Sequence, residues 1–320
     1  MKYLTNKFLS FWFSPMMPHR LAILRVATGG FALWYLWTRL NLFHKVSKTD
    51  VALFEPVGIA KALAAPLPAE WFNYILILTI ILNVLYLIGW RFKWTGPLFA
   101  ILFLFTMCYR NSWSMIYHNY NALTLHILVL GFVASADVLS YDAWRKKLKG
   151  KVQPIIAQWH YGWAIRLICA ATAATYVLSG LAKVYGELAW EWVTGSAMRS
   201  QVAVDTLRKA MLVEGDPSVF EWLYPYTFLF LCMGLLTMIL ELGAPIALVN
   251  RRLALTWVVL TCMMHWGILF IMGIKFPYQT SGFVFLAFLP VEQLWFRLQA
   301  WMEETTKSLT SSDAYSEYST

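Results

Sequence analysis

Residues 72–90 read FNYILILTIILNVLYLIGW and contain no charged side chain. An α-helix needs about 20 mostly apolar residues to cross the hydrocarbon core of a bilayer, so this stretch predicts a transmembrane helix. A soluble domain carries about 25% charged residues, whereas this chain of 320 residues has 13% charged and 59% hydrophobic residues. The mean hydropathy of +0.56 is also positive. We therefore expect an all-α integral membrane protein.

Similar apolar stretches recur along the chain and predict about eight transmembrane helices. The predicted spans are 21–42, 72–90, 95–109, 121–139, 162–181, 226–249, 253–274 and 280–296. Together they form one transmembrane domain at 20–297. A cytoplasmic N-terminal segment at 1–19 precedes the domain, and a polar tail at 298–320, expected to be disordered, follows it.

The formal net charge of +9 is distributed along the chain in short clusters. Basic residues gather at 91–93, 145–151 and 251–252, each between two apolar stretches. Short basic connections are typical of the cytoplasmic side of a membrane, which predicts that both termini are cytoplasmic. The same distribution favours membrane lipid over nucleic acid as the surroundings, so no nucleic-acid partner is expected.

Two long connections, 43–71 and 182–225, then face the outer side. The second is amphipathic and contains Trp190 and Trp192 within a stretch of mixed charge. Amphipathic segments with aromatic side chains lie in the interface plane of a membrane. We expect short helices on the outer membrane surface here.

Several ionisable residues fall within the predicted spans. Such groups are costly inside a membrane, so each is a candidate for function. The structural alternative is pairing within the bundle: we expect Glu241 to be buried and paired with Arg25 or Arg166, and His126 to be hydrogen-bonded in the core. Since the histidines show neither HxxxH nor HExxH spacing, no metal site is expected.

Lys183 stands at the outer end of the fifth predicted span, between the apolar residues 176–181 and the two tryptophans. Aromatic and apolar surface could enclose its amine. Desolvation disfavours the charged ammonium and would make this lysine a usable base. Alternatively, the side chain reaches the membrane surface and its nitrogen stays in water. The local sequence leaves both interpretations open.

A series of motifs in order along the chain resembles the membrane domain of the vitamin K-dependent γ-glutamyl carboxylases. The segment Ser179-Gly180-Leu181-Ala182-Lys183, followed by Trp192, Gly195 and Met198, resembles their lysine motif, which also marks the bacterial horizontally transferred transmembrane (HTTM) family. The other matching segments are Arg25 to Gly30, Pro66-Leu67-Pro68 with Trp71, Gly89 with Arg91, Ser112-Trp113 before a polar cluster, Glu241, and His265 through Gly273 to Phe276. The resemblance covers residues 20–295.

The resemblance implies roles for several residues. Lys183 would be the base that deprotonates reduced vitamin K or menaquinol, and His265 would be the histidine at the quinone site. His118, Asn119 and Asn121 would supply the polar partner of the oxygenated cofactor, with Trp192, Phe276 and Tyr278 as further cofactor contacts. With oxygen and carbon dioxide, such an enzyme would modify glutamate in a peptide substrate. A bacterial inner membrane is the implied location.

Three functions stay open at this point. The retained Lys183 favours a carboxylase-like enzyme. Animal carboxylases continue into a soluble domain, whereas this chain ends soon after the eighth predicted span, which favours a non-catalytic protein that assists maturation or export of a partner peptide. A small-molecule transporter is less favoured, because inverted repeats with broken helices are not apparent.

Overall fold

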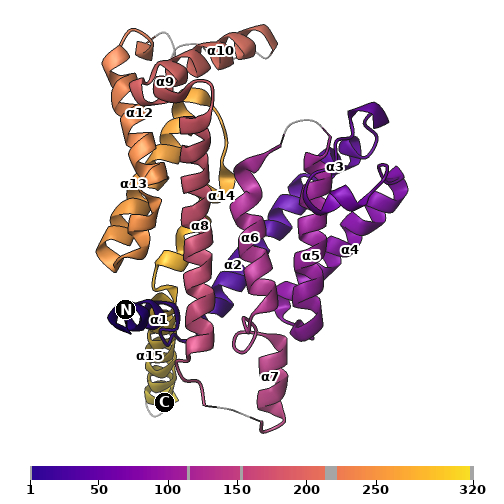
Figure 1. Ribbon diagram of the computed structural model, residues 1–320. Coiled ribbons are helices and arrows are strands. Elements are labelled where there is room, and N and C mark those ends of the chain that lie inside the picture. Colours follow the sequence, from indigo (N-terminus) through magenta and orange to yellow (C-terminus); the bar gives the residue numbers. More distant parts are fainter. Residues whose placement is uncertain (1, 114–115, 152–153, 213–221, 318–320) are drawn as a thin grey trace.

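The computed structural model describes residues 2–113, 116–151, 154–212 and 222–317, and all regular elements within these ranges are helical (Figure 1). The first half contains α1 (Lys2–Trp12), α2 (Pro18–Thr38), α3 (Leu40–Val46), η1 (Val51–Leu53), η2 (Gly58–Ala62), α4 (Ala69–Ile88), α5 (Phe92–Asn111), η3 (His118–Tyr120), α6 (Asn121–Phe132) and α7 (Tyr141–Leu148). The second half contains α8 (Trp159–Tyr185), α9 (Ala189–Thr194), α10 (Ser196–Leu212), α12 (Thr227–Leu242), η4 (Ala244–Leu248), α13 (Arg251–Met272), α14 (Pro277–Thr280), η5 (Phe283–Phe288) and α15 (Val291–Glu317).

Within the described ranges, five helices are long and apolar enough to cross a membrane: α2, α4, α5, α8 and α13. The helix α12 is equally apolar but has only 16 residues. Large apolar side chains cover the outside of these helices, as lipid-facing surfaces require. The prediction of an all-α integral membrane protein is confirmed, while the count of eight spans stays a prediction.

Two of the predicted spans are interrupted in the structure. The stretch 226–249 forms α12 up to Leu242, turns at Gly243, and continues as the 3₁₀-helix η4. The stretch 280–296 was expected to be one helix, and this prediction is wrong. Gly282 adopts a positive φ of 79°, and Pro290 separates η5 from α15. A left-handed residue and a proline each stop a regular helix, which accounts for the break.

Two other boundaries differ from the prediction. The helix α6 ends at Phe132, earlier than the predicted end at 139. The tail expected to be disordered from residue 298 is helical in α15 as far as Glu317. The amphipathic loop at 182–225 does contain short helices, α9 and α10, while its residues 213–221 lie outside the described part of the chain.

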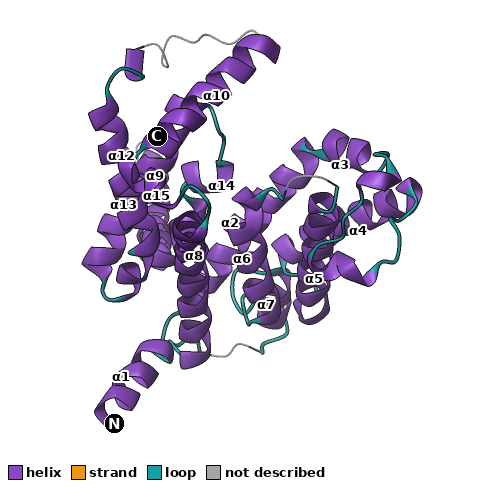
Figure 2. Cartoon of the chain, turned by 45° about the horizontal axis from the view of Figure 1, so that its top comes forward, coloured by secondary structure: helices purple, strands orange, loops and turns teal. Residues whose placement is uncertain are grey.

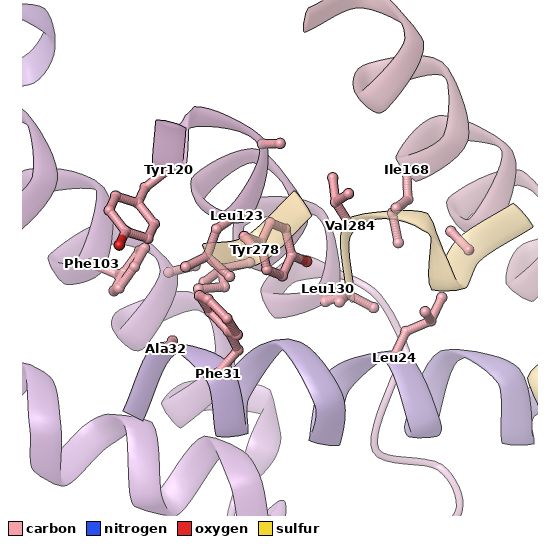
Figure 3. Packing of buried hydrophobic residues seen from close by; sticks show 14 of the residues in the cluster. Leu24, Phe31, Ala32, Phe103, Tyr120, Leu123, Leu130, Ile168, Tyr278 and Val284 are labelled. Atoms are coloured by element: carbon pink, nitrogen blue, oxygen red, sulfur yellow. The ribbon is translucent and has the colours of Figure 1, made fainter. Parts of the chain in front are cut away.

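The helices form two groups, with α2 to α6 on one side and α8 to α13 on the other (Figure 1). The short helix α14 lies between the groups, and its Tyr278 is fully buried against Phe31 and near Leu123 (Figure 3). The Tyr278 hydroxyl and the imidazole of His126 are 2.8 Å apart, and the other ring nitrogen of His126 is 2.8 Å from the Thr172 hydroxyl on α8. The prediction that His126 is hydrogen-bonded in the core is confirmed. The hydrogen bonds from Tyr278 through His126 to Thr172 link the two groups of helices.

The short basic connections share one end of the molecule. Both chain termini and α7 lie at the end opposite α9 and α10 (Figure 1). The α4–α5 turn is at the same end, because the Asp142 carboxylate on α7 accepts hydrogen bonds from the backbone N–H groups of Arg91 and Phe92. Arg251 lines a cavity together with Phe11 of α1. The helical packing thus gathers the predicted cytoplasmic clusters on one side.

Candidate functional site

Lys183 and Glu241 form an ion pair between α8 and α12. The Lys183 amine lies 2.5 and 2.6 Å from the two carboxylate oxygens of Glu241, and the side chains are only 18% and 7% exposed. The Ser179 hydroxyl donates to the same carboxylate at 3.2 Å and accepts from the Lys183 amine at 3.3 Å. Ser179 and Lys183 stand four residues apart, so α8 presents both on one face.

This pairing corrects the partner predicted for Glu241. Glu241 is buried as expected, but neither Arg25 nor Arg166 is its cation. The Arg25 guanidinium donates to the Leu139 carbonyl at 2.5 Å and stands over the ring of Phe92. The Arg166 guanidinium stacks on Phe11 at 4.4 Å. Arg25 and Arg166 therefore contact aromatic rings, and Arg25 also a backbone carbonyl, instead of the Glu241 carboxylate.

The Trp192 ring lies 5.5 Å from the Lys183 amine and forms a cation–π contact with it. Close backbone packing of α9 on α12 places this ring. A Cβ on Gly195, whose φ is +79°, would lie 2.1 Å from the Phe230 carbonyl oxygen, and one on Gly234 would lie 2.5 Å from the Trp192 carbonyl oxygen. Only glycine permits this approach, which explains the glycine that follows Trp192 in the lysine motif.

His265, from α13, reaches the same region through Tyr176 of α8. Its Nε2 atom is 2.9 Å from the Tyr176 hydroxyl, while its Nδ1 atom is buried and has no hydrogen-bond partner in the described part of the chain. Phe276 lies between two histidine rings, with its centroid 5.0 Å from that of His265 and 5.8 Å from that of His118. The loop after α13 thus brings α13, α14 and η3 together.

Electrostatics links His118 to the ion pair. The exposed ring of His118 is still partly desolvated by its neighbours; this desolvation, with the Lys183 charge, lowers the pKa of His118 from its ordinary value, and Glu241 opposes the shift. His265 also interacts electrostatically with the positive charge of Lys183. A histidine with a lowered pKa is neutral at pH 7, so His118 can accept or donate a hydrogen bond there.

The remaining predicted residues lie at different distances from this centre. Asn119 has a buried side-chain oxygen for which the described residues offer no partner, and its backbone carbonyl accepts a hydrogen bond from Gln279 at 3.3 Å. Asn121 is exposed at the start of α6. Tyr278 belongs to the core through its bond to His126. The structure therefore gathers Lys183, His265, His118, Trp192 and Phe276, with Asn119 beside them.

Three participants were not predicted as site residues: Glu241, Ser179 and Tyr176. Glu241 was identified as a matching residue and as a buried group in need of a cation, but it was given no role at the site. Ser179 belongs to the lysine motif, and its spacing of four from Lys183 was the available signal. Tyr176 lies seven residues before Lys183, again on that face of α8. The helical period, applied to α8 alone, would have identified both.

Comparison with known proteins gives one match. The family model of the HTTM domain matches residues 13–292, nearly the whole chain. The matched range includes every site residue described above. No curated protein and no solved structure matches the chain.

Proposed function

Because the chain belongs to the HTTM domain family, a family of membrane domains, we propose that it is a carboxylase-like membrane enzyme in which Lys183 is the base. The cofactor would be reduced vitamin K or menaquinol, and the reaction would use oxygen and carbon dioxide to modify glutamate in a peptide substrate. The observation that carries the proposal is the mostly buried Lys183 side chain, whose amine is held beside the Glu241 carboxylate.

The ion pair suggests how a paired lysine can act as a base. A lysine that takes a proton must first be neutral, and a desolvated ion pair is expensive in an apolar site. A contact of 2.5 Å between the Lys183 amine and the Glu241 carboxylate allows a proton to pass between them. In the neutral form the proton is on Glu241 and the Lys183 amine has a free lone pair. The amine then accepts a proton from an acidic hydroxyl group, while Glu241 keeps its own.

The unpaired polar atoms of the site fit a ligand with hydroxyl groups. The buried Nδ1 of His265 and the side-chain oxygen of Asn119 have no hydrogen-bond partner among the residues that the structure describes. Buried polar groups are nearly always hydrogen-bonded, so these two atoms suggest a place for polar groups of a ligand. When bound, the reduced quinone would supply an ionisable hydroxyl group and the electrons that oxygen consumes.

Aromatic side chains complete the proposed site. Trp192 covers the Lys183 amine, and Phe276 separates His265 from His118. Flat rings bind an aromatic cofactor by stacking and exclude water, which strengthens the electrostatic interactions of the polar groups. His118, neutral at pH 7, can donate a hydrogen bond to an oxygen that gains negative charge.

An assay of quinone oxidation tests this proposal. Membranes with the wild-type protein would be supplied with reduced vitamin K or menaquinol, oxygen and bicarbonate, and quinone epoxide would be measured. We expect epoxide with the wild type and a loss of at least about 100-fold with Lys183→Ala, the scale typical of general acid–base catalysis. Lys93→Ala is a matched control, because the Lys93 amine also lies over a tryptophan, 5.6 Å from the Trp94 ring, but has no carboxylate partner in the described residues.

The outcome separates chemistry from folding. The double variant Lys183→Met/Glu241→Leu removes the ion pair without leaving a lone buried charge, and should fold but form no epoxide. Equal epoxide formation by wild type and Lys183→Ala would remove Lys183 from the mechanism. No epoxide with either protein would reject the enzymatic proposal as a whole.

A second candidate rests on the ion pair itself. With both carboxylate oxygens of Glu241 within 2.6 Å of the amine, Lys183 could serve only to join α8 to α12. The chain would then be a non-catalytic membrane protein that assists maturation or export of a partner peptide. This candidate predicts a protein that co-purifies with a peptide and that keeps this partner in the double variant.

The proposed topology has about eight spans, with both termini in the cytoplasm of a bacterial cell. Its support is the gathering of basic connections opposite α9 and α10 (Figure 1). Single cysteines in a cysteine-free background test it, at the exposed positions Leu148 and Val204. An impermeant reagent on intact cells should label Val204→Cys and not Leu148→Cys, and the opposite pattern would reverse the orientation.

A further inference from the structure

A cavity of about 330 Å³ lies at the other end of α8 from Lys183. Arg166 lines it, and lies about 25 Å from Lys183 at a rise of 1.5 Å per residue. The remaining walls come from α1, α2, η4, the start of α13, and the segment from η5 to α15. Small-molecule sites have volumes of about 300–1,000 Å³, so the cavity can hold a ligand.

The charge around this cavity is mainly positive. Three arginines line it, Arg20, Arg166 and Arg251, against one carboxylate, Glu292. Glu292 lies 3.7 Å from the Arg20 Nε atom. Arg166 has no carboxylate within 4 Å in the described part of the chain, and it repels Arg20 electrostatically. The cavity wall therefore carries more positive than negative charge.

The arginines also have unused hydrogen-bond donors. The Nε atoms of Arg20 and Arg166 are both buried and have no hydrogen-bond partner within the described ranges. A guanidinium presents its donors in a fixed fork that fits phosphate and carboxylate oxygens, and buried donors of this kind are seldom left unused. The donors therefore call for an anionic acceptor in the cavity.

The start of α13 adds to the positive potential. Asn250 and Arg251 line the cavity, and the Asn250 side chain accepts a hydrogen bond from the Leu253 N–H group as the helix cap. The first N–H groups of a helix have no acceptor within the helix, and its dipole favours an anion there. This 22-residue helix begins where the three arginines converge.

We propose that this cavity binds a phosphate group, carried either by the headgroup of an anionic phospholipid or by a small soluble phosphate. Phosphate satisfies the arginine donors and the helix start together, since each of its oxygens accepts several hydrogen bonds. The site is independent of the Lys183 site and of the reaction proposed there.

The surroundings favour the lipid source. Phe11 of α1 covers Arg166, and the same short helix exposes Phe8 and Leu9 (61% and 45% exposed). Figure 2 shows α1 projecting from the helical bundle beside the start of α8. A helix with exposed apolar side chains of this kind lies in the membrane interface, at the depth of lipid phosphates.

Native mass spectrometry of the detergent-purified protein tests the proposal with phosphatidylglycerol, phosphatidylcholine and inorganic phosphate as probes. We expect phosphatidylglycerol to bind best, and Arg166→Gln to weaken this binding about tenfold, which corresponds to the loss of one charge-assisted contact. Arg145→Gln is the matched control. It removes one arginine charge from exposed α7 at the same end of the molecule, outside the cavity.

Further measurements distinguish a phospholipid headgroup from a soluble phosphate and control for misfolding of the variants. Arg251→Gln changes an exposed residue at the cavity, so it should weaken phosphatidylglycerol binding without lowering the unfolding temperature. Thermal stabilisation by inorganic phosphate that Arg166→Gln abolishes would support the soluble source. If Arg166→Gln and Arg251→Gln bind phosphatidylglycerol and phosphate as tightly as Arg145→Gln, the proposal is overturned.

Discussion

The helix α8 carries one cation near each end, and the fold surrounds the two in opposite ways. Lys183 has a carboxylate at 2.5 Å, a hydroxyl group and a covering indole. Arg166 has an aromatic ring at 4.4 Å, a second arginine nearby, and no carboxylate within 4 Å in the described residues. The Lys183–Glu241 pair has no net charge, whereas the side chains around Arg166 have a net positive charge. Four changes should separate these two environments.

The largest effect should follow from Lys183→Met. It leaves the Glu241 carboxylate buried without a cation, which costs about 3–5 kcal/mol of unfolding free energy in comparable pairs. Thermal or denaturant unfolding in detergent measures the loss, and Lys93→Met provides the control at an exposed lysine. A loss below about 1 kcal/mol would mean that the pair contributes little and that the lysine end resembles the arginine end.

Gly195→Ala should rank second. The new methyl group would meet the Phe230 carbonyl at 2.1 Å in a backbone with a φ of +79°. Overpacking and left-handed strain together should cost roughly 2–4 kcal/mol. The tryptophan fluorescence of this variant should change as Trp192 moves from Lys183. Gly267→Ala is a suitable control, because a methyl group there meets no atom within 4 Å. Equal stability of the two variants would contradict the close packing of α9 on α12.

Tyr176→Phe should have a smaller effect of about 1–2 kcal/mol, since it leaves the Nε2 atom of His265 without its partner. The ring stays in place against Trp257, so packing is preserved. Unfolding measurements on Tyr176→Phe, His265→Phe and the double variant would give the coupling energy of the pair. Strictly additive losses would show that the hydroxyl and imidazole do not interact.

Arg166→Gln should change stability least, by less than about 1 kcal/mol. It removes a cation–π contact of modest value and also relieves repulsion by Arg20. Unfolding in lipid-free detergent, with Arg145→Gln as the reference, isolates this contribution. A loss as large as that of Lys183→Met would show that Arg166 has a buried structural role, and the contrast between the two ends would disappear.

The helical fold could be predicted because apolar length alone identifies a span, as in α2, α4, α5, α8 and α13. The helix breaks at Gly243 and Pro290 could not be predicted in the same way. Both stretches are mostly apolar, and hydropathy does not distinguish a continuous helix from two short pieces packed inside protein.

The site shows a similar limit. Lys183 and His265 were identified from motifs, but the cation of Glu241 was wrongly chosen, because the depth of each charge depends on where a helix is interrupted. The turn after Leu242 brings Glu241 to the level of Lys183. The true acceptor of Arg25 is the backbone carbonyl of Leu139. Every residue has a backbone carbonyl, so the amino-acid sequence does not indicate which carbonyl Arg25 contacts.

One hydrogen bond has a consequence for how the chain is assembled. Arg20 of α2 donates to the carbonyl oxygen of Ala287 in η5 at 2.8 Å, across 267 positions of sequence. The broken segment there cannot satisfy all its own carbonyl groups, and lipid offers no donor. The Ala287 carbonyl group has its donor once α2 is in place. Folding of this C-terminal segment is thereby tied to α2, the first of the long apolar helices.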